Sequence, residues 1–158
     1  MRLNAIAILI LLLAWSALPA AAAGPAQLPR GYASWEKSAE KVVTDKNSLF
    51  YGIHYIYVDR KAMPAYRKGS GYPEGSQFVV EFFSIKEVGD KPTRGKKSMV
   101  VLMRRDKSQT ATGGWLFAGF GADGKPSGLD PAKNCFSCHL QEAKEREFVI
   151  SRHADFRK

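Results

Sequence analysis

The segment Cys135-Phe136-Ser137-Cys138-His139 constrains this chain more than any other part of it. It contains both cysteines of the protein, separated by two residues, and a histidine directly after the second. Two thiols about one helical turn apart can add to the two vinyl groups of one haem, and the adjacent imidazole then lies under the iron as its axial ligand. The motif therefore predicts one covalent haem c, attached through Cys135 and Cys138, with His139 as the metal ligand.

Two other kinds of site use cysteines at this spacing. A disulfide or a thioredoxin-like redox pair would use both thiols, but it leaves His139 without a role and normally lies near the first strand-to-helix turn, not near the end of a chain. A structural zinc site needs four ligands, and the other histidines that could complete it are His54 and His153. The residues favour haem over both alternatives.

The N-terminus has the pattern of a secretory signal peptide. Arg2 precedes an unbroken apolar run from Ala5 to Trp15, and small residues follow at 20–23. Because this run is about half of the roughly 20 residues that span a bilayer, an uncleaved membrane anchor is the weaker alternative. We expect a signal peptide at residues 1–23, a mature domain at residues 24–158 and a periplasmic location. Covalent haem attachment suits this compartment, because a Cys-x-x-Cys pair without haem would oxidise there.

The composition fits one folded domain with a basic surface. Apolar residues make up 45% of the 158 residues and charged residues 25%, which is enough to bury a core and too apolar for a disordered chain. The 24 Lys and Arg exceed the 15 Asp and Glu, giving a formal net charge of +9. The basic residues form no long run, so we expect no nucleic-acid binding; the charge suits an acidic redox partner or an anionic membrane surface.

The pattern of apolar residues predicts an α+β fold: mainly antiparallel β-sheet with a few helices, the C-terminal one carrying the haem motif. The expected strands are residues 49–58, 77–88, 98–103 and 115–120, with a short strand or extended segment at 148–151. The expected helices are Trp35–Val43, N-capped by Ser34, a turn or two around 63–66, and the haem-binding helix at 131–144. The segments 89–97 and 104–114 are expected to be a basic loop and a polar connection.

Two familiar haem c architectures do not suit this order of elements. A small all-helical cytochrome c usually attaches its haem early and takes a methionine ligand from further along the chain, but no methionine follows His139. The four-helix cytochrome c′ attaches haem near its end but needs long amphipathic helices, and the segments rich in Tyr, Val and Phe do not repeat with a period of 3.6.

Several segments occur in the order found in one known family. They are Tyr55-Ile56-Tyr57-Val58, Tyr72-Pro73-Glu74-Gly75-Ser76 running into Phe78-Val79-Val80-Glu81-Phe82-Phe83, Trp115-Leu116-Phe117, the haem motif, and Phe148-Val149-Ile150-Ser151. On these segments the chain resembles the cytochrome P-460 and cytochrome c′-beta family, small secreted β-rich proteins with one c-type haem near the C-terminus. The resemblance covers essentially the whole mature chain.

The resemblance implies an iron held by His139 with an open distal position, where ligands bind. Members similar to cytochrome P-460 carry an additional lysine-to-haem cross-link and oxidise hydroxylamine, whereas c′-beta members lack it, have an apolar aromatic distal pocket and bind nitric oxide or carbon monoxide. The segment Gln77–Phe83, where we expect the cross-linking residue, contains no lysine, and Val80 takes its place. Lys86, Lys96 and Lys97 are the remaining candidates for a cross-link.

Three hypotheses follow. The first is a cytochrome that binds a small ligand such as nitric oxide; the second is an enzyme with hydroxylamine oxidoreductase activity; the third is an electron carrier that docks an acidic partner. The resemblance also favours a homodimer.

Other residues have both a functional and a structural interpretation. Phe82 and Phe83, with Phe78, could cover the distal face of the haem or form plain core. Glu81, the one acid in the apolar stretch Phe78–Phe83, could act as a catalytic proton relay, or it could point to solvent or meet a basic partner such as Arg104.

The remaining candidates concern iron ligation. The possible sixth ligands are Met63, Met99 and Met103, for which core packing is the alternative. His54 and His153 are expected to be surface or hydrogen-bonded residues rather than axial ligands.

Overall fold

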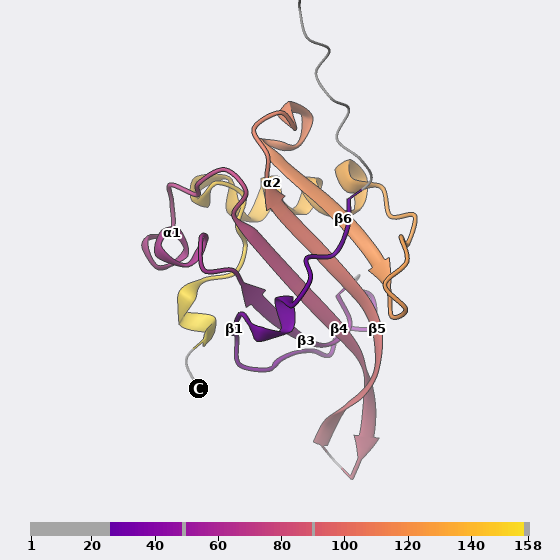
Figure 1. The fold of residues 1–158 in the computed structure, drawn as a ribbon. Helices are drawn as coiled ribbons and strands as arrows, with labels where there is room; N and C mark the ends of the chain where they lie inside the picture. Colours follow the sequence, from indigo (N-terminus) through magenta and orange to yellow (C-terminus); the bar gives the residue numbers. More distant parts are fainter. Residues whose placement is uncertain (1–25, 49, 90, 157–158) are drawn as a thin grey trace, which may run out of the picture.

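The computed structural model describes residues 26–156 except 49 and 90, so the signal peptide expected at residues 1–23 lies outside the described residues (Figure 1). Its centre is a six-stranded antiparallel sheet with the order β1-β3-β4-β5-β6, in which β2 also pairs with β3. The strands are β1 Glu36–Lys37, β2 Lys41–Val43, β3 Gly52–Val58, β4 Gln77–Val88, β5 Lys91–Arg105 and β6 Trp115–Gly121. The α+β fold with a mainly antiparallel sheet is confirmed.

The helices are short. They are α1 Met63–Lys68, α2 Ser137–Ala143, the π-helix η3 Pro131–Phe136, and the 3-10 turns η1 Tyr32–Ser34, η2 Thr110–Thr112, η4 Lys144–Arg146 and η5 His153–Phe156. The helix expected at residues 131–144 is therefore present as η3 followed by α2. Within the part of the chain that the structure describes, no helix is long and apolar enough to cross a membrane.

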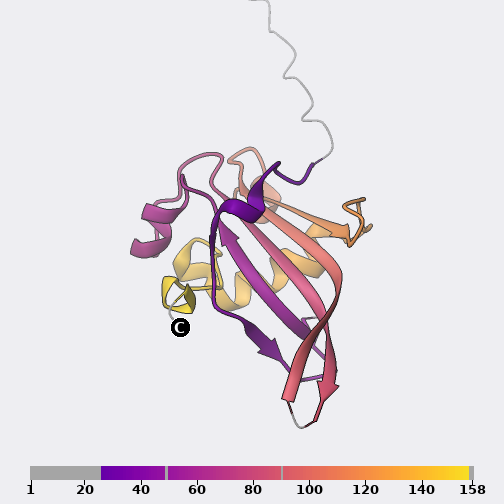
Figure 2. The ribbon, with the colours of Figure 1, turned by 60° about the horizontal axis from the view of Figure 1, so that its bottom comes forward.

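Strand β4 is apolar on both of its faces because both faces of the sheet are covered. The C-terminal helical segment packs on one face, and the N-terminal segment lies on the other (Figure 2). Phe78 and the neighbouring Trp115 and Cys135 belong to the core on the first face. Val79 belongs to the second core, against which Trp35 packs. Alternation along β4 thus assigns each residue to one of two cores.

The helix expected from Trp35 to Val43 is wrong. These residues form β1 and β2, which pair with β3 through Glu36↔Val58 and Lys41↔His54. The backbone groups of this segment therefore bond to β3 rather than within a helix, so tertiary pairing overrides a weak local preference. Ser34 caps no helix here, and its hydroxyl donates to the carbonyl of Gly31 at 2.8 Å.

The basic loop expected at residues 89–97 is also wrong. Strands β4 and β5 stay paired as far as Val88↔Lys91 and extend beyond the rest of the sheet as a hairpin (Figure 1). Most residues of this hairpin are exposed on both faces. The sequence therefore lacks the alternation of apolar and polar residues from which a strand is predicted. Arg104 and Arg105 likewise belong to β5 rather than to the polar connection that was expected to begin there.

Residues 148–151 form no strand. Glu147 and Phe148 have positive φ angles of 50° and 67°, and these two left-handed residues turn the chain back after α2. The segment that follows lies over the first face of the sheet, where Val149 is buried in the core.

Candidate functional site

A cavity of about 310 Å³ lies on the first face of the sheet, within the size range of ligand sites. Its walls are mostly apolar, and the ring of His139 forms part of them. The lining residues are Lys41, Val43, Ser48, Phe50, His54, Ile56, Phe78, Val80, Phe82, Val101, Met103, Phe117, His139, Val149, Ile150 and Ser151. The sheet and the segment after α2 therefore enclose an apolar space beside one imidazole.

His139 is held by two contacts. Its ring centroid lies 4.9 Å from that of Phe117 on β6, in an edge-on arrangement. Its Nδ1 lies 2.6 Å from the carbonyl oxygen of Phe148. With the proton on Nδ1 the ring donates this hydrogen bond, and the lone pair on Nε2 is available to a metal. Burial lowers the pKa of His139, a shift that the hydrogen bond to Phe148 partly opposes, so the ring is in the neutral form that binds metals.

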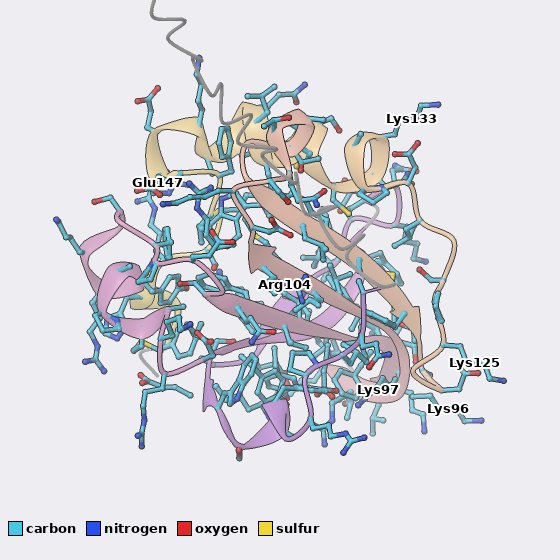
Figure 3. The ribbon with its side chains drawn as sticks, turned by 45° about the horizontal axis from the view of Figure 1, so that its top comes forward. Lys96, Lys97, Arg104, Lys125, Lys133 and Glu147 are labelled. Atoms are coloured by element: carbon cyan, nitrogen blue, oxygen red, sulfur yellow. The ribbon has the colours of Figure 1, made fainter. Side chains whose placement is uncertain are left out.

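The carbonyl of Phe148 is positioned by the turn after α2. The indole Nε1 of Trp115 donates to the carbonyl of Glu147 at 2.8 Å, and the carboxylate of Glu147 accepts from the backbone N–H of Gly71. Glu147 lies on the segment beyond α2, as Figure 3 shows. A Cβ at Gly113 would lie 2.4 Å from the Phe148 ring, so this close approach requires glycine. Sheet, loop and helix together fix the orientation of His139.

The two cysteines are free thiols one turn apart. Cys135 is buried in the core that includes Phe117, and Cys138 is half-buried. The π-helix that carries Cys135 is N-capped by Asp130, whose carboxylate accepts from the backbone N–H groups of Ala132 and Lys133 at 2.9 and 3.1 Å. Burial raises the pKa of both thiols, so both are protonated and uncharged. Two thiols, a metal-ready imidazole and an adjoining apolar cavity fit a haem c.

Phe82 lines the cavity together with Phe78 and Val80, because residues two apart in β4 share a face. Phe83 projects to the opposite face. There its ring centroid lies 5.9 Å from that of Tyr55 and 5.1 Å from the guanidinium carbon of Arg94. Its predicted contact with the cofactor is therefore corrected: Phe83 is a packing residue of the second face.

Glu81 also projects to the second face and does not line the cavity. Its buried carboxylate accepts hydrogen bonds from the hydroxyls of Tyr32 and Tyr57, each at 2.8 Å, and from the ammonium of Lys97. Burial raises the pKa of Glu81, but these three hydrogen bonds outweigh burial and leave the pKa below its usual value. The role of a distal proton relay is corrected to that of a buried ion pair; the partner is Lys97, not Arg104.

The sequence interpretation missed two titratable residues of the cavity. Lys41 and His54 face each other across β2 and β3, and both line the cavity. Among the described residues Lys41 is the one lysine in its lining, whereas Lys86 and Lys96 are exposed on the projecting hairpin. Strand parity could have found His54, which lies two residues from Ile56 and so shares its face.

Of the remaining candidate iron ligands, one lines the cavity. Met103 lines the cavity, whereas Met63 and Met99 are not among its lining residues. His153 stacks on Phe156 with ring centroids 6.2 Å apart and is also not part of the cavity. In the part of the chain that is described, no three His, Cys, Asp or Glu side chains are grouped closely enough to hold a metal ion among themselves.

The comparisons with known proteins agree with this geometry. The family model for Cytochrome P460 matches residues 29–151, a range that includes the strands β1 to β6, the cavity and the Cys-x-x-Cys-His motif. A search of the curated proteins finds no match. Since the family model covers most of the chain, this protein belongs to the cytochrome P460 family.

Proposed function

We propose that this protein is a periplasmic monohaem c-type cytochrome whose iron, held by His139, binds a small ligand such as nitric oxide. Membership of the family supports a monohaem cytochrome. Iron ligation and ligand binding are supported by the arrangement of His139. One ring nitrogen is hydrogen-bonded to the carbonyl of Phe148, and the ring borders an apolar cavity. Cys135 and Cys138 on the same helical segment would attach the haem.

The residues of the cavity suit a small uncharged ligand. The bound haem would supply an iron with an open coordination position. Phe78, Val80 and Phe82 form an apolar wall that excludes water and offers an anionic ligand no compensating charge. The hydrogen bond from His139 to Phe148 orients the imidazole and increases its basicity. These features favour neutral diatomic molecules over charged ligands.

Two specific observations support other functions. Lys41 lines the cavity, so it is the residue that would carry a lysine-to-haem cross-link in an enzyme that oxidises hydroxylamine. Met103 also lines the cavity, and a methionine sulfur on the iron would make the protein an electron carrier. Each alternative predicts a different coordination state, which makes them separable by spectroscopy.

The test is to produce the full chain, with its signal peptide, in a bacterium that matures haem c. The ferrous protein is expected to show the absorption spectrum of five-coordinate, high-spin haem c, and tryptic peptides should carry haem through Cys135 and Cys138 alone. A broad, red-shifted Soret band with haem joined to a peptide containing Lys41 would support the enzyme. A low-spin, six-coordinate spectrum would support the electron carrier. A Cys135→Ala, Cys138→Ala double variant should contain no covalent haem.

Location and partners extend the same proposal. We expect cleavage after Ala23, which N-terminal sequencing of periplasmic protein would detect, and a homodimer, which light scattering would detect. Lys96, Lys125 and Lys133 project outward from the molecule (Figure 3). Such exposed charges suit steering toward an acidic redox partner, so electron transfer should slow as salt concentration rises.

A further inference from the structure

We propose that Lys41 and His54 form a carboxylate-binding site at one end of the cavity, and that this site holds a propionate group of the haem. The inference rests on the haem attachment proposed above. It assigns a role to two residues whose cavity positions the sequence did not reveal.

The two side chains form one site because their strands are paired. Lys41 of β2 lies directly opposite His54 of β3, so the two side chains are neighbours on the same face of the sheet. Both are half-buried, and both line the cavity. Ser48 and Phe50, from the connection between β2 and β3, line the cavity beside them. The only positively charged side chain of the lining thus lies at this end, among the described residues.

His54 has hydrogen-bonding capacity that its surroundings leave unused. Its Nδ1 is buried and has no hydrogen-bond partner among the described residues, and one side of the ring packs against Phe82 with centroids 5.2 Å apart. Burial and the charge of Lys41 lower the pKa of His54, so the neutral ring has one N–H to donate. A buried polar atom without a partner costs free energy, which an occupant of the cavity that accepts a hydrogen bond would recover.

The register of the sheet places His54 away from His139. His139 packs on Phe117, which lies in the same cross-sheet row as Val58 of β3, and His54 is four residues from Val58. Three strand spacings of about 4.8 Å and four rises of about 3.3 Å separate the backbones of Phe117 and His54 by roughly 15–20 Å. That separation places His54 toward the opposite end of the cavity from Phe117 and His139.

The chemistry of haem c accounts for an occupant at this distance. Thioether bonds join the vinyl half of the porphyrin to the cysteines, and the two propionates extend from the opposite half. Cys135 lies on η3, which packs beside β6 and shares a core with Phe117, so the propionates would extend across the sheet, away from β6 and toward β3. A carboxylate in an otherwise apolar cavity needs a cation and hydrogen-bond donors, and Lys41 with His54 supplies both.

The test compares variants of the haem-loaded protein. Lys41→Met should lower the reduction potential, since a nearby cation favours the ferrous state, which carries one positive charge less. Lys41→Arg should retain the potential. Lys46→Met is the matched control: Lys46 is exposed in the same connection and its loss should leave the potential unchanged. His54→Leu should shift the infrared band of ¹³C-labelled propionate carboxylates, as should Lys41→Met.

A wild-type measurement keeps the test independent of how the variants fold. The labelled carboxylate band of one propionate should lie where ion-paired carboxylates absorb, and two bands at the solvated position would overturn the inference. Unchanged potentials and bands in Lys41→Met and His54→Leu, in protein whose covalent haem is confirmed by mass, would also overturn it while leaving the proposed function intact. So would a covalent bond between Lys41 and haem. Absence of covalent haem would instead overturn the proposed function, and the inference with it.

Discussion

The Nδ1 atom of His139 lies 2.6 Å from the carbonyl oxygen of Phe148, nine residues further along the chain. This hydrogen bond joins α2 to the segment that closes the cavity, and it fixes which ring nitrogen carries the proton. The carbonyl is held in place from behind, because Trp115 donates to Glu147 and the Phe148 ring lies against Gly113. Residues outside the lining of the cavity therefore control the orientation of the imidazole that we propose as the iron ligand.

Gly113→Ala should disturb this hydrogen bond. Gly113 has a φ of 64°, and its new Cβ would lie 2.4 Å from the Phe148 ring, so strain and overlap together should cost about 1–3 kcal/mol of stability. A displaced Phe148 carbonyl would make the imidazole less basic, so the iron–histidine stretching frequency of the ferrous protein should fall and the reduction potential should rise.

Gly31→Ala is the matched control for this variant. Gly31 has a similar φ of 73°, but a Cβ there meets no atom within 4 Å. Gly31→Ala therefore introduces the same backbone strain but no overlap with a neighbouring side chain. The variant should lose some stability and keep the iron–histidine stretching frequency of the wild type. Equal frequencies in the two variants would contradict the role assigned to Phe148.

Phe82 and Phe83 provide a second comparison, because they are adjacent in β4 and face opposite cores. Phe82→Leu should change the rate of carbon monoxide or nitric oxide binding severalfold, since it enlarges the cavity, whereas Phe83→Leu should leave the rate unchanged. Both should cost about 1 kcal/mol of stability. Flash photolysis measures the rates and denaturant unfolding measures the stability. Equal effects on binding would show that the cavity is not the ligand site.

The sequence predicted the elements that carry a strong local pattern. The bounds of β4, Gln77–Val88, were expected as found, because its alternation of large apolar residues is continuous. The helical segment around Cys135 was expected from its motif and from Pro131. The helix expected at 35–43 failed because β1 and β2 are held by long-range pairing with β3, which no local pattern reveals.

The site was predictable only in part for the same reason. The residues expected to attach the haem can be read directly from the Cys-x-x-Cys-His motif. The cavity cannot be read in this way, because it is formed by strands whose registers are set by pairing. Placing Phe82 inside and Phe83 outside requires knowing which parity of β4 faces the C-terminal segment. Lys41 could not be found at all while its segment was interpreted as a helix. The hydrogen bond to Phe148 depends on two left-handed residues, neither of which is glycine.

Met103→Leu distinguishes ligand binding from electron transfer. Met103 lines the cavity and is buried, so the proposed five-coordinate iron predicts that the ferrous spectrum of this variant matches that of the wild type. Since leucine has a similar volume, stability should change by less than about 1.5 kcal/mol. Conversion of a low-spin spectrum to a high-spin one would identify Met103 as the sixth ligand and reject the proposal.

The buried ion pair on the second face predicts how stability depends on pH. The pKa of Glu81 is held below its usual value of 4.5 in the folded protein, because hydrogen bonds from Lys97 and two tyrosines outweigh the effect of burial. A lowered folded-state pKa means that the stabilisation is present above pH 4.5 and is lost as the pH falls through the folded value.

Glu81→Gln should remove this dependence. At pH 7 the variant should lose about 1–3 kcal/mol, since a buried charged hydrogen-bonding group is replaced and Lys97 keeps no carboxylate partner in this cluster. Below pH 4.5 wild type and variant should converge, as followed by urea unfolding between pH 7 and pH 3. Glu87→Gln, an exposed change on the same strand, should track the wild type throughout. Parallel pH profiles for wild type and Glu81→Gln would show that Glu81 does not stabilise the fold as an anion.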